Sequence, residues 1–113
     1  MSKNIKAYNS ILDLIGNTPL VKLNNITKDI PGNFYAKVEA FNPGHSNKDR
    51  IALHIIESAE KKGLLKPGST IIETTSGNTG FSLSMVSMIK GYNCILAVSS
   101  KSSSDKIDML KSM

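Results

Sequence analysis

The feature that most constrains this chain is the alternation of strand and helix patterns from Phe34 to Met113. The strand patterns alternate in polarity or form short apolar runs, and apolar residues at helical spacing follow each of them. Turns containing glycine or proline separate the segments. Strand patterns occupy 34–40, 70–74 and 93–98, and helix patterns occupy 46–62, 81–90 and 105–113. This order predicts an α/β fold with a parallel β-sheet and flanking helices, because right-handed crossovers place helices on the faces of such a sheet.

The first predicted helix has the clearest boundaries. Ser46 and Asp49 have the Ser-x-x-Asp spacing of a capping box, in which side chains bond the free N–H groups of the first turn. Lys61 and Lys62 precede Gly63 at the other end, where cations offset exposed carbonyl groups and glycine ends the helix.

Residues 1–33 do not follow the alternation. They contain a short apolar element at 11–15, a turn at 16–19 and a strand at 20–23. We expect this segment to be an arm that is attached to something else rather than another strand–helix unit.

Composition excludes several classes of function. The 113 residues carry a net charge of +5, but the lysines are scattered, tryptophan is absent and aromatic residues make up only 5%. Nucleic-acid binding needs basic groups gathered with stacking aromatics, so we expect no nucleic-acid partner. No apolar run approaches the roughly 20 residues that span a bilayer, and residues 1–10 lack the apolar stretch of a signal peptide. We expect a cytoplasmic protein with no membrane partner.

The few cysteine and histidine residues bear on the cellular compartment and on metal binding. A single cysteine, Cys94, excludes an internal disulfide framework and fits a reducing compartment. His45 and His54 do not form a metal-ligand cluster with it, so we predict no metal site.

Lys48 is the first candidate for chemistry. It stands between a strand pattern and a helix pattern, where parallel sheets collect their ligands. A cation in the opening turn opposes the helix dipole, which favours the neutral amine that can form a Schiff base. The alternative is a solvated lysine with Asp49 and Arg50 as ordinary charges of a helix start.

The turn at 75–80, with the sequence TSGNTG, is the second candidate. Backbone N–H groups at a strand-to-helix junction and glycines that permit close approach make a cradle for an anion. Hydroxyl and carboxamide groups here can bond a carboxylate; they belong to Thr75, Ser76, Asn78 and Thr79. The alternative is a turn whose hydroxyls cap the next helix.

Three segments carry a resemblance to a known family. Residues 11–23 (ILDLIGNTPLVKL), 41–52 (FNPGHSNKDRIA) and 73–80 (ETTSGNTG) together closely resemble the N-terminal part of the cysteine synthase/cystathionine β-synthase family. These are pyridoxal-phosphate enzymes of the tryptophan synthase β-like fold, also called fold type II. The resemblance covers essentially the whole chain, and the second motif favours the branch that performs β-replacement.

The resemblance implies roles for particular residues. Lys48 matches the lysine that binds pyridoxal 5′-phosphate covalently and later shuttles protons. Thr75, Ser76, Asn78 and Thr79 match the loop that holds the carboxylate of the substrate, and Asn78 also matches the side chain that meets the ring hydroxyl of the cofactor. The implied reaction replaces the β-substituent of serine or O-acetylserine with sulfide, which gives cysteine.

The resemblance also implies that a part of the protein lies outside these residues. The Gly-rich cup for the cofactor phosphate and the partner of the pyridine nitrogen have no counterpart here. We expect residues 1–33 to be an N-terminal arm and strand packed on a larger domain, and residues 34–113 to form an incomplete βαβαβα domain. We therefore expect the chain alone to be inactive, and the full-length protein to be a homodimer.

Two positions depart from the family pattern, and two other readings stay open. His45 and Asn47 stand where many members have glycine and valine, so His45 is a candidate for altering polarity near the cofactor. The closest alternative activity is that of a cystathionine β-synthase, which joins serine to the thiol of homocysteine. An alternative of another class is a non-catalytic binding or interaction module.

Overall fold

The computed structural model describes residues 6–75 and 77–113. In chain order the elements are the 3₁₀ helix η1 (Ile11–Leu14), strands β1 (Leu20–Lys22) and β2 (Tyr35–Lys37), the 3₁₀ helix η2 (Glu39–Phe41), helix α1 (Lys48–Lys61), strand β3 (Thr70–Thr74), helix α2 (Asn78–Lys90), strand β4 (Asn93–Ala97) and helix α3 (Ser104–Lys111). No helix in these two ranges is long and apolar enough to cross a membrane.

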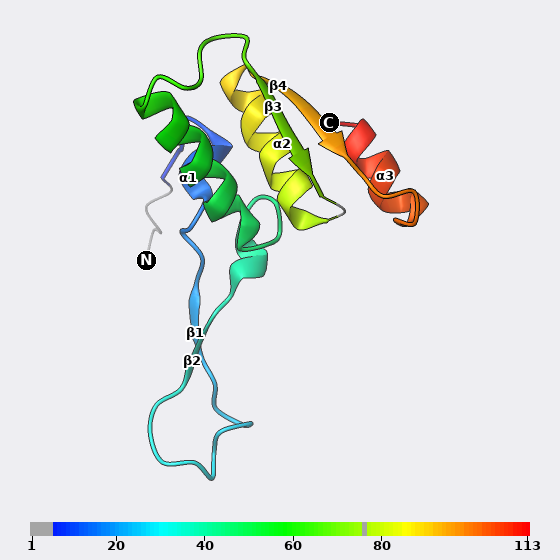
Figure 1. The fold of residues 1–113 in the computed structure, drawn as a ribbon. Coiled ribbons are helices and arrows are strands. Elements are labelled where there is room, and N and C mark those ends of the chain that lie inside the picture. Colours follow the sequence, from blue (N-terminus) through cyan, green and yellow to red (C-terminus); the bar gives the residue numbers. More distant parts are fainter. Residues whose placement is uncertain (1–5, 76) are drawn as a thin grey trace.

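The body of the molecule is a parallel strand pair with helices packed beside it, which confirms the predicted fold class. β3 and β4 pair in register, from Thr70 opposite Asn93 to Thr74 opposite Ala97. α2 connects the two strands and lies between α1 and β4 (Figure 1). Both α1 and α2 begin at the end of the body to which β3 and β4 point (Figure 1).

The core forms where α1 meets α2. Its buried apolar residues are Ala52, Ile56, Leu83, Met85 and Val86. Ala52 and Ile56 are four positions apart on α1 and therefore share one helix face. Packing between the helices thus orients α1 relative to α2 and fixes the direction in which their first turns point.

The predicted helix and strand boundaries in the body are close to the observed ones. β3 has the predicted bounds, and α1 ends before Gly63, which has the left-handed φ of 69° that glycine tolerates best. α2 begins at Asn78 rather than at Phe81. The polar residues Asn78 and Thr79 therefore belong to the first turn of α2 and not to the loop before it.

The prediction that the strand at 34–40 joins the parallel sheet is wrong. β2 is only Tyr35–Lys37, and it pairs antiparallel with β1, from Leu20 opposite Lys37 to Lys22 opposite Tyr35. An antiparallel ribbon tolerates water on its faces, so alternating polarity suits it, whereas parallel strands need apolar residues on both faces. Because β1 and β2 lie on opposite sides of residue 33, the chain is hydrogen bonded across the predicted division between 1–33 and 34–113.

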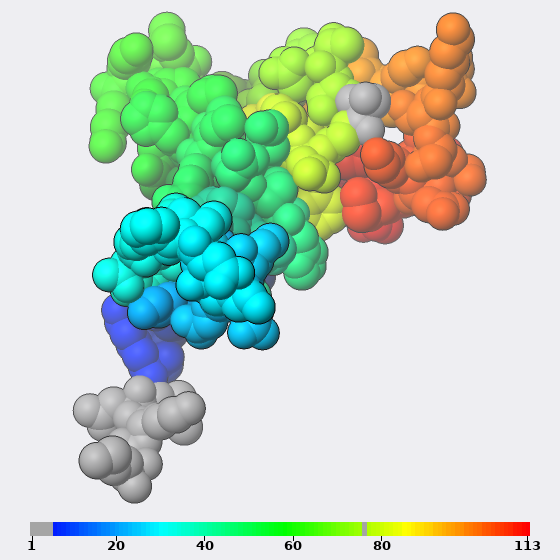
Figure 2. Space-filling model, turned by 90° about the horizontal axis from the view of Figure 1, so that it is seen from below, coloured from blue at the N-terminus to red at the C-terminus, as the bar shows by residue number. Residues whose placement is uncertain are grey.

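β1, β2 and the loop between them form an arm, residues 19–38, that projects from the body (Figure 1). Figure 2 views the molecule from below and shows the cyan residues of the arm in front of the body, well apart from the orange and red C-terminal residues. Leu20, Ile26 and Tyr35 are 64%, 81% and 53% exposed. A two-stranded ribbon of this kind has little stability of its own in water, so its attachment to the body matters.

Candidate functional site

Lys48 is the first residue of α1 and is half-buried. Its backbone N–H donates to Oγ of Ser46 at 3.2 Å, and its Nζ donates to Oδ1 of Asn47 at 3.4 Å. None of the ion pairs within 6–75 and 77–113 involves Lys48. The amine is therefore held at a helix start without a carboxylate partner in this part of the chain, which suits a group that has to react covalently.

The turn between β3 and α2 surrounds the hydroxyl of Thr75. Oγ1 of Thr75 accepts from the backbone N–H groups of Gly77 and Gly80, each at 3.3 Å. The Thr75 N–H donates to the carbonyl oxygen of Ala97 at 3.0 Å, which extends the parallel ladder into the turn. Thr75 thus stabilises the turn through its own hydroxyl, as the capping alternative anticipated, and its contact with a carboxylate stays a prediction.

Asn78 and Thr79 are the first two residues of α2. The side chain of Asn78 is exposed, and that of Thr79 is half-buried. Apart from its chain neighbours, no atom of the described residues lies within 4 Å of a Cβ placed on Gly77, so this part of the chain leaves that side of the turn open. Free N–H groups and the helix dipole make such a position favourable for an anion. Ser76, also predicted to bind the carboxylate, lies outside the described residues.

A buried carboxylate joins the two helix starts. Asp49 is 0% exposed, its Oδ2 accepts from the N–H of Gly44 at 2.5 Å, and its Oδ1 accepts from Oγ of Ser82 at 2.5 Å. The predicted capping box is therefore wrong in its second half, because Asp49 turns inward to α2 instead of bonding Ser46. Ser46 does accept from the first turn, as predicted.

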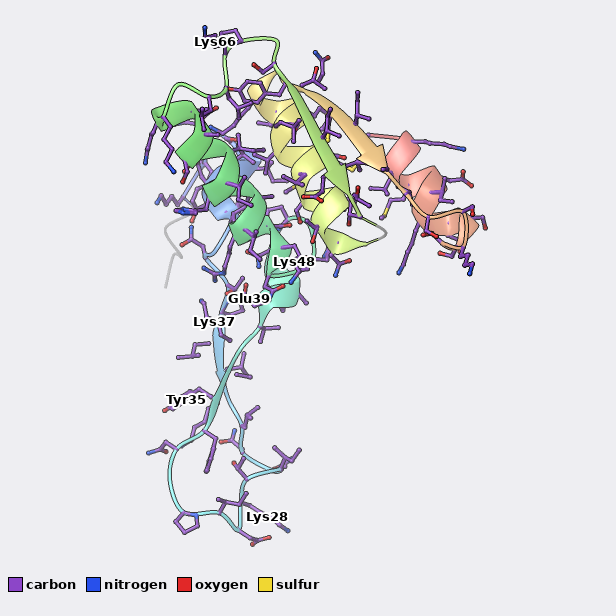
Figure 3. The ribbon with its side chains drawn as sticks, in the orientation of Figure 1. Lys28, Tyr35, Lys37, Glu39, Lys48 and Lys66 are labelled. Carbon is purple, nitrogen blue, oxygen red and sulfur yellow. The ribbon has the colours of Figure 1, made fainter. Side chains whose placement is uncertain are left out.

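Arg50 joins the same helix start to the segments on both sides of the arm. Its Nε and Nη2 donate to the two carboxylate oxygens of Glu39 at 2.8 and 2.9 Å, and Nη2 also donates to the carbonyl of Gly16 at 2.9 Å. Gly16 in turn donates to Oδ1 of Asn42 at 2.8 Å, and Asn42 is 1% exposed. Figure 3 shows Glu39 and Lys48 at the junction of the arm and the body, with Lys28 at the far tip of the arm.

The ion pair between Arg50 and Glu39 shifts the pKa values of both side chains. The Arg50 guanidinium, through its hydrogen bonds, lowers the pKa of Glu39 to about 2, with Asn42 and Thr18 contributing further hydrogen bonds. The same contact raises the pKa of Arg50. This lowered pKa keeps Glu39 ionised in the physiological range, and the bidentate pair links the base of the arm to α1.

Sequence reasoning missed the roles of Asp49, Arg50 and Glu39. The sequence pattern predicts a capping residue at Asp49 and a strand residue at Glu39, and it gives Arg50 no role beyond that of an ordinary charge at a helix start. The sequence does contain one signal for this network, namely the turn sequences at 16–19 and 42–44. Glycine and asparagine in two turns allow the two backbone segments to approach each other closely. Gly16 has a φ of 83°, and a Cβ there would lie 2.7 Å from Nη1 of Arg50.

The amino-acid sequence is similar to those of known enzymes. The family model for pyridoxal-phosphate dependent enzymes matches residues 11–113. The chain belongs to this family. It is 55% identical over 107 residues to a cystathionine beta-synthase of Apis mellifera, an alignment that covers 93% of this chain and 21% of that protein. It is 45% identical over 103 residues to cysteine synthase 1 of Emericella nidulans, which covers 91% of this chain and 28% of that protein.

A solved structure agrees with the observed fold. The chain matches a hydrogen sulfide-producing enzyme of Fusobacterium nucleatum with a TM-score of 0.88 and 46% identity, over 96% of this chain and 36% of that enzyme. The partial tryptophan synthase β-like architecture is therefore confirmed, as are the family and its cofactor, pyridoxal phosphate. The chain spans between about a fifth and a third of the length of these relatives.

The residues present fit that cofactor. An aldehyde needs an accessible primary amine, and Lys48 is a half-buried lysine outside the ion pairs of the described chain. The open side of the turn at Gly77 leaves room for a bound group beside the start of α2.

Proposed function

We propose that this chain carries the reactive lysine and the carboxylate loop of an enzyme that replaces the β-substituent of serine or O-acetylserine, with cysteine as the product. The observation that carries the proposal is the bond between Asp49 and Ser82, which holds the start of α1, with Lys48, against the start of α2, with Asn78 and Thr79. An amine and an anion cradle at one end of a sheet suit the binding of an α-amino acid.

Each residue has a defined task in this proposal. The Lys48 amine binds the cofactor aldehyde and later takes and returns the proton at Cα of the substrate. The side chains of Thr75, Ser76, Asn78 and Thr79, with N–H groups at the start of α2, hold the substrate carboxylate, and the Asn78 carboxamide also meets the ring hydroxyl of the cofactor. When bound, pyridoxal phosphate supplies the electron sink for loss of the β-substituent. A sulfide or thiol then adds at Cβ.

A second candidate is the formation of cystathionine from serine and homocysteine. It is favoured by the 55% identity to the Apis mellifera protein, against 45% for the Emericella nidulans cysteine synthase. The two candidates share the chemistry at Lys48 and differ only in the acceptor.

Product analysis with paired substrates tests these candidates. The full-length protein with pyridoxal phosphate is given serine or O-acetylserine, and then sulfide or homocysteine. The leading proposal predicts cysteine formed mainly from the sulfide arm, and the second predicts cystathionine from the homocysteine arm. A protein that forms neither product, and whose Lys48 takes up no cofactor, is instead a non-catalytic binding module.

We also propose that the 113 residues alone hold pyridoxal phosphate weakly and do not turn over substrate. Support comes from the relatives, since the chain corresponds to only 36% of the Fusobacterium nucleatum enzyme. Each charge-assisted hydrogen bond to the phosphate that the chain lacks is worth about 1.5–3 kcal/mol. Turnover of O-acetylserine by the isolated chain would contradict this.

We place the full-length protein in the cytoplasm as a homodimer. Cys94, the single cysteine, fits a reducing compartment. Light scattering of the purified full-length protein measures its mass directly, and a monomeric mass would overturn the dimer.

A further inference from the structure

Asp49 is the one fully buried acidic residue described, and it follows Lys48 directly. Aspartate is seldom fully buried without partners, because an unpaired carboxylate loses its hydration. Both of its oxygens are used, one by the N–H of Gly44 and the other by the hydroxyl of Ser82, each at 2.5 Å. Asp49 therefore connects three segments: the loop before α1, the first turn of α1, and α2.

The partner on α2 has an informative position. Ser82 comes four residues after Asn78, so the two side chains lie on the same face of α2, one turn apart. Asp49 is adjacent to Lys48 in the first turn of α1. The bond between Asp49 and Ser82 thus controls how the turn that carries Lys48 sits against the turn that carries Asn78.

The loop is packed closely onto the same carboxylate. A Cβ built on Gly44 would collide with the carboxylate of Asp49. Gly44 does not have a positive φ, so its backbone conformation does not require glycine. Glycine is required here because the Asp49 carboxylate lies so close to the Gly44 backbone. The backbone leading into Lys48 therefore rests directly on Asp49.

The other ends of the two helices are held separately. Oε2 of Glu60 accepts from Nζ of Lys90 at 2.9 Å, and Oε1 accepts from the hydroxyl of Tyr92 at 2.9 Å. Loss of the bond at Ser82 would therefore leave α1 and α2 paired at their C-terminal ends and over the apolar core, and would loosen them where Lys48 lies.

We propose that Asp49, through Ser82, is a positioning residue that sets the Lys48 amine relative to Asn78. This rests on the proposed function, in which those two residues meet the same cofactor and substrate. Misplacement of a reacting group by about 1 Å can cost on the order of 100-fold in rate, so a small shift at this joint has a large effect.

Ser82→Ala tests this in the full-length protein with pyridoxal phosphate, with Ser87→Ala as the matched control. Ser82 and Ser87 are both 0% exposed on α2, but the Ser87 hydroxyl has no hydrogen-bond partner among the described residues. Ser82→Ala is expected to lower kcat about 10- to 100-fold with a much smaller change in KM, and Ser87→Ala to leave both near wild type. The yield of borohydride-trapped cofactor on Lys48 should fall in Ser82→Ala alone.

Equal kcat, KM and Lys48 trapping in the two variants would overturn the proposal. If Ser82→Ala does not fold, Asp49→Asn replaces it, since an amide keeps the size of the side chain but cannot accept from both partners. Unchanged kcat and trapping in Asp49→Asn would also overturn the proposal.

A measurement without cofactor separates this proposal from the proposed function. The rate at which a small acylating reagent modifies Lys48 in the apoprotein is expected to change in Ser82→Ala and not in Ser87→Ala. Failure of wild-type protein to bind cofactor at Lys48 contradicts the proposed function, whereas identical acylation rates in the two variants contradict the positioning role.

Discussion

Arg50 donates two parallel hydrogen bonds to the carboxylate of Glu39, at 2.8 and 2.9 Å, and so ties the start of α1 to the base of the arm. Bidentate pairs of this geometry are stronger and more directional than single contacts between charged groups. The same guanidinium reaches the carbonyl of Gly16, so three separate stretches of chain meet at one side chain.

Glu39→Gln is expected to give a pH-dependent loss of stability. The pKa of Glu39 is about 2 in the folded protein, below the usual value of 4.5 for a glutamate, because Arg50 bonds the ionised form. The resulting stabilisation is complete above about pH 5 and is lost as the pH falls from there towards 2. Urea unfolding at several pH values should show a gap between wild type and Glu39→Gln that narrows with acidification.

Asp29→Asn, at an exposed site on the arm, is the control for this measurement and should show no comparable gap. A difference between wild type and Glu39→Gln that stays constant from neutral pH to pH 2 would contradict the assignment of the low pKa to the pair with Arg50.

Gly80→Ala is expected to destabilise the protein by about 1–3 kcal/mol, the usual cost of overpacking. An added Cβ would lie 2.5 Å from Cγ2 of Thr75 and 3.1 Å from Cδ1 of Leu96. Thr75→Ser removes Cγ2 and keeps the hydroxyl that accepts from Gly77 and Gly80. Denaturant unfolding should therefore show a smaller cost for Gly80→Ala in the Thr75→Ser background, and equal costs in both backgrounds would refute the clash.

Tyr92 is expected to ionise at a higher pH than an ordinary tyrosine. Its hydroxyl donates to Glu60, and an ionised phenol would face the negative carboxylate, so the contact raises the pKa of Tyr92. Titration followed by ultraviolet absorbance of the phenolate should show a late phase that Tyr92→Phe removes and Glu60→Gln moves to lower pH. A late phase that persists in Tyr92→Phe would contradict this assignment.

The body of the fold could be predicted from the sequence because local signals there agree with the tertiary structure. Apolar runs in β3 and β4, helical spacing in α1 and glycine at the helix ends each point to the observed element. The sequence places Asn78 and Thr79 in a loop, because polar residues are equally compatible with a loop and with the first turn of a helix.

The arm and the buried network could not be predicted in the same way. Alternating polarity is compatible with any half-exposed strand, so it could not tell whether the strand at 35–37 pairs with β1 or joins the parallel sheet. The sequence predicts that Asp49 completes the capping box at the start of α1, because the Ser-x-x-Asp spacing is typical of a helix start. Its burial depends on Ser82, 33 residues later, which no local pattern reveals.

The central claim is that Lys48 binds the cofactor, and reductive trapping tests it most directly. Full-length protein is incubated with pyridoxal phosphate and reduced with borohydride, and its peptides are analysed by mass spectrometry. The account predicts one stoichiometric label on the peptide containing Lys48, and none in Lys48→Ala. In the isolated 113 residues it predicts weak labelling spread over exposed lysines such as Lys28 and Lys66. A stoichiometric label on another lysine of the full-length protein, or no label at Lys48, would contradict the account.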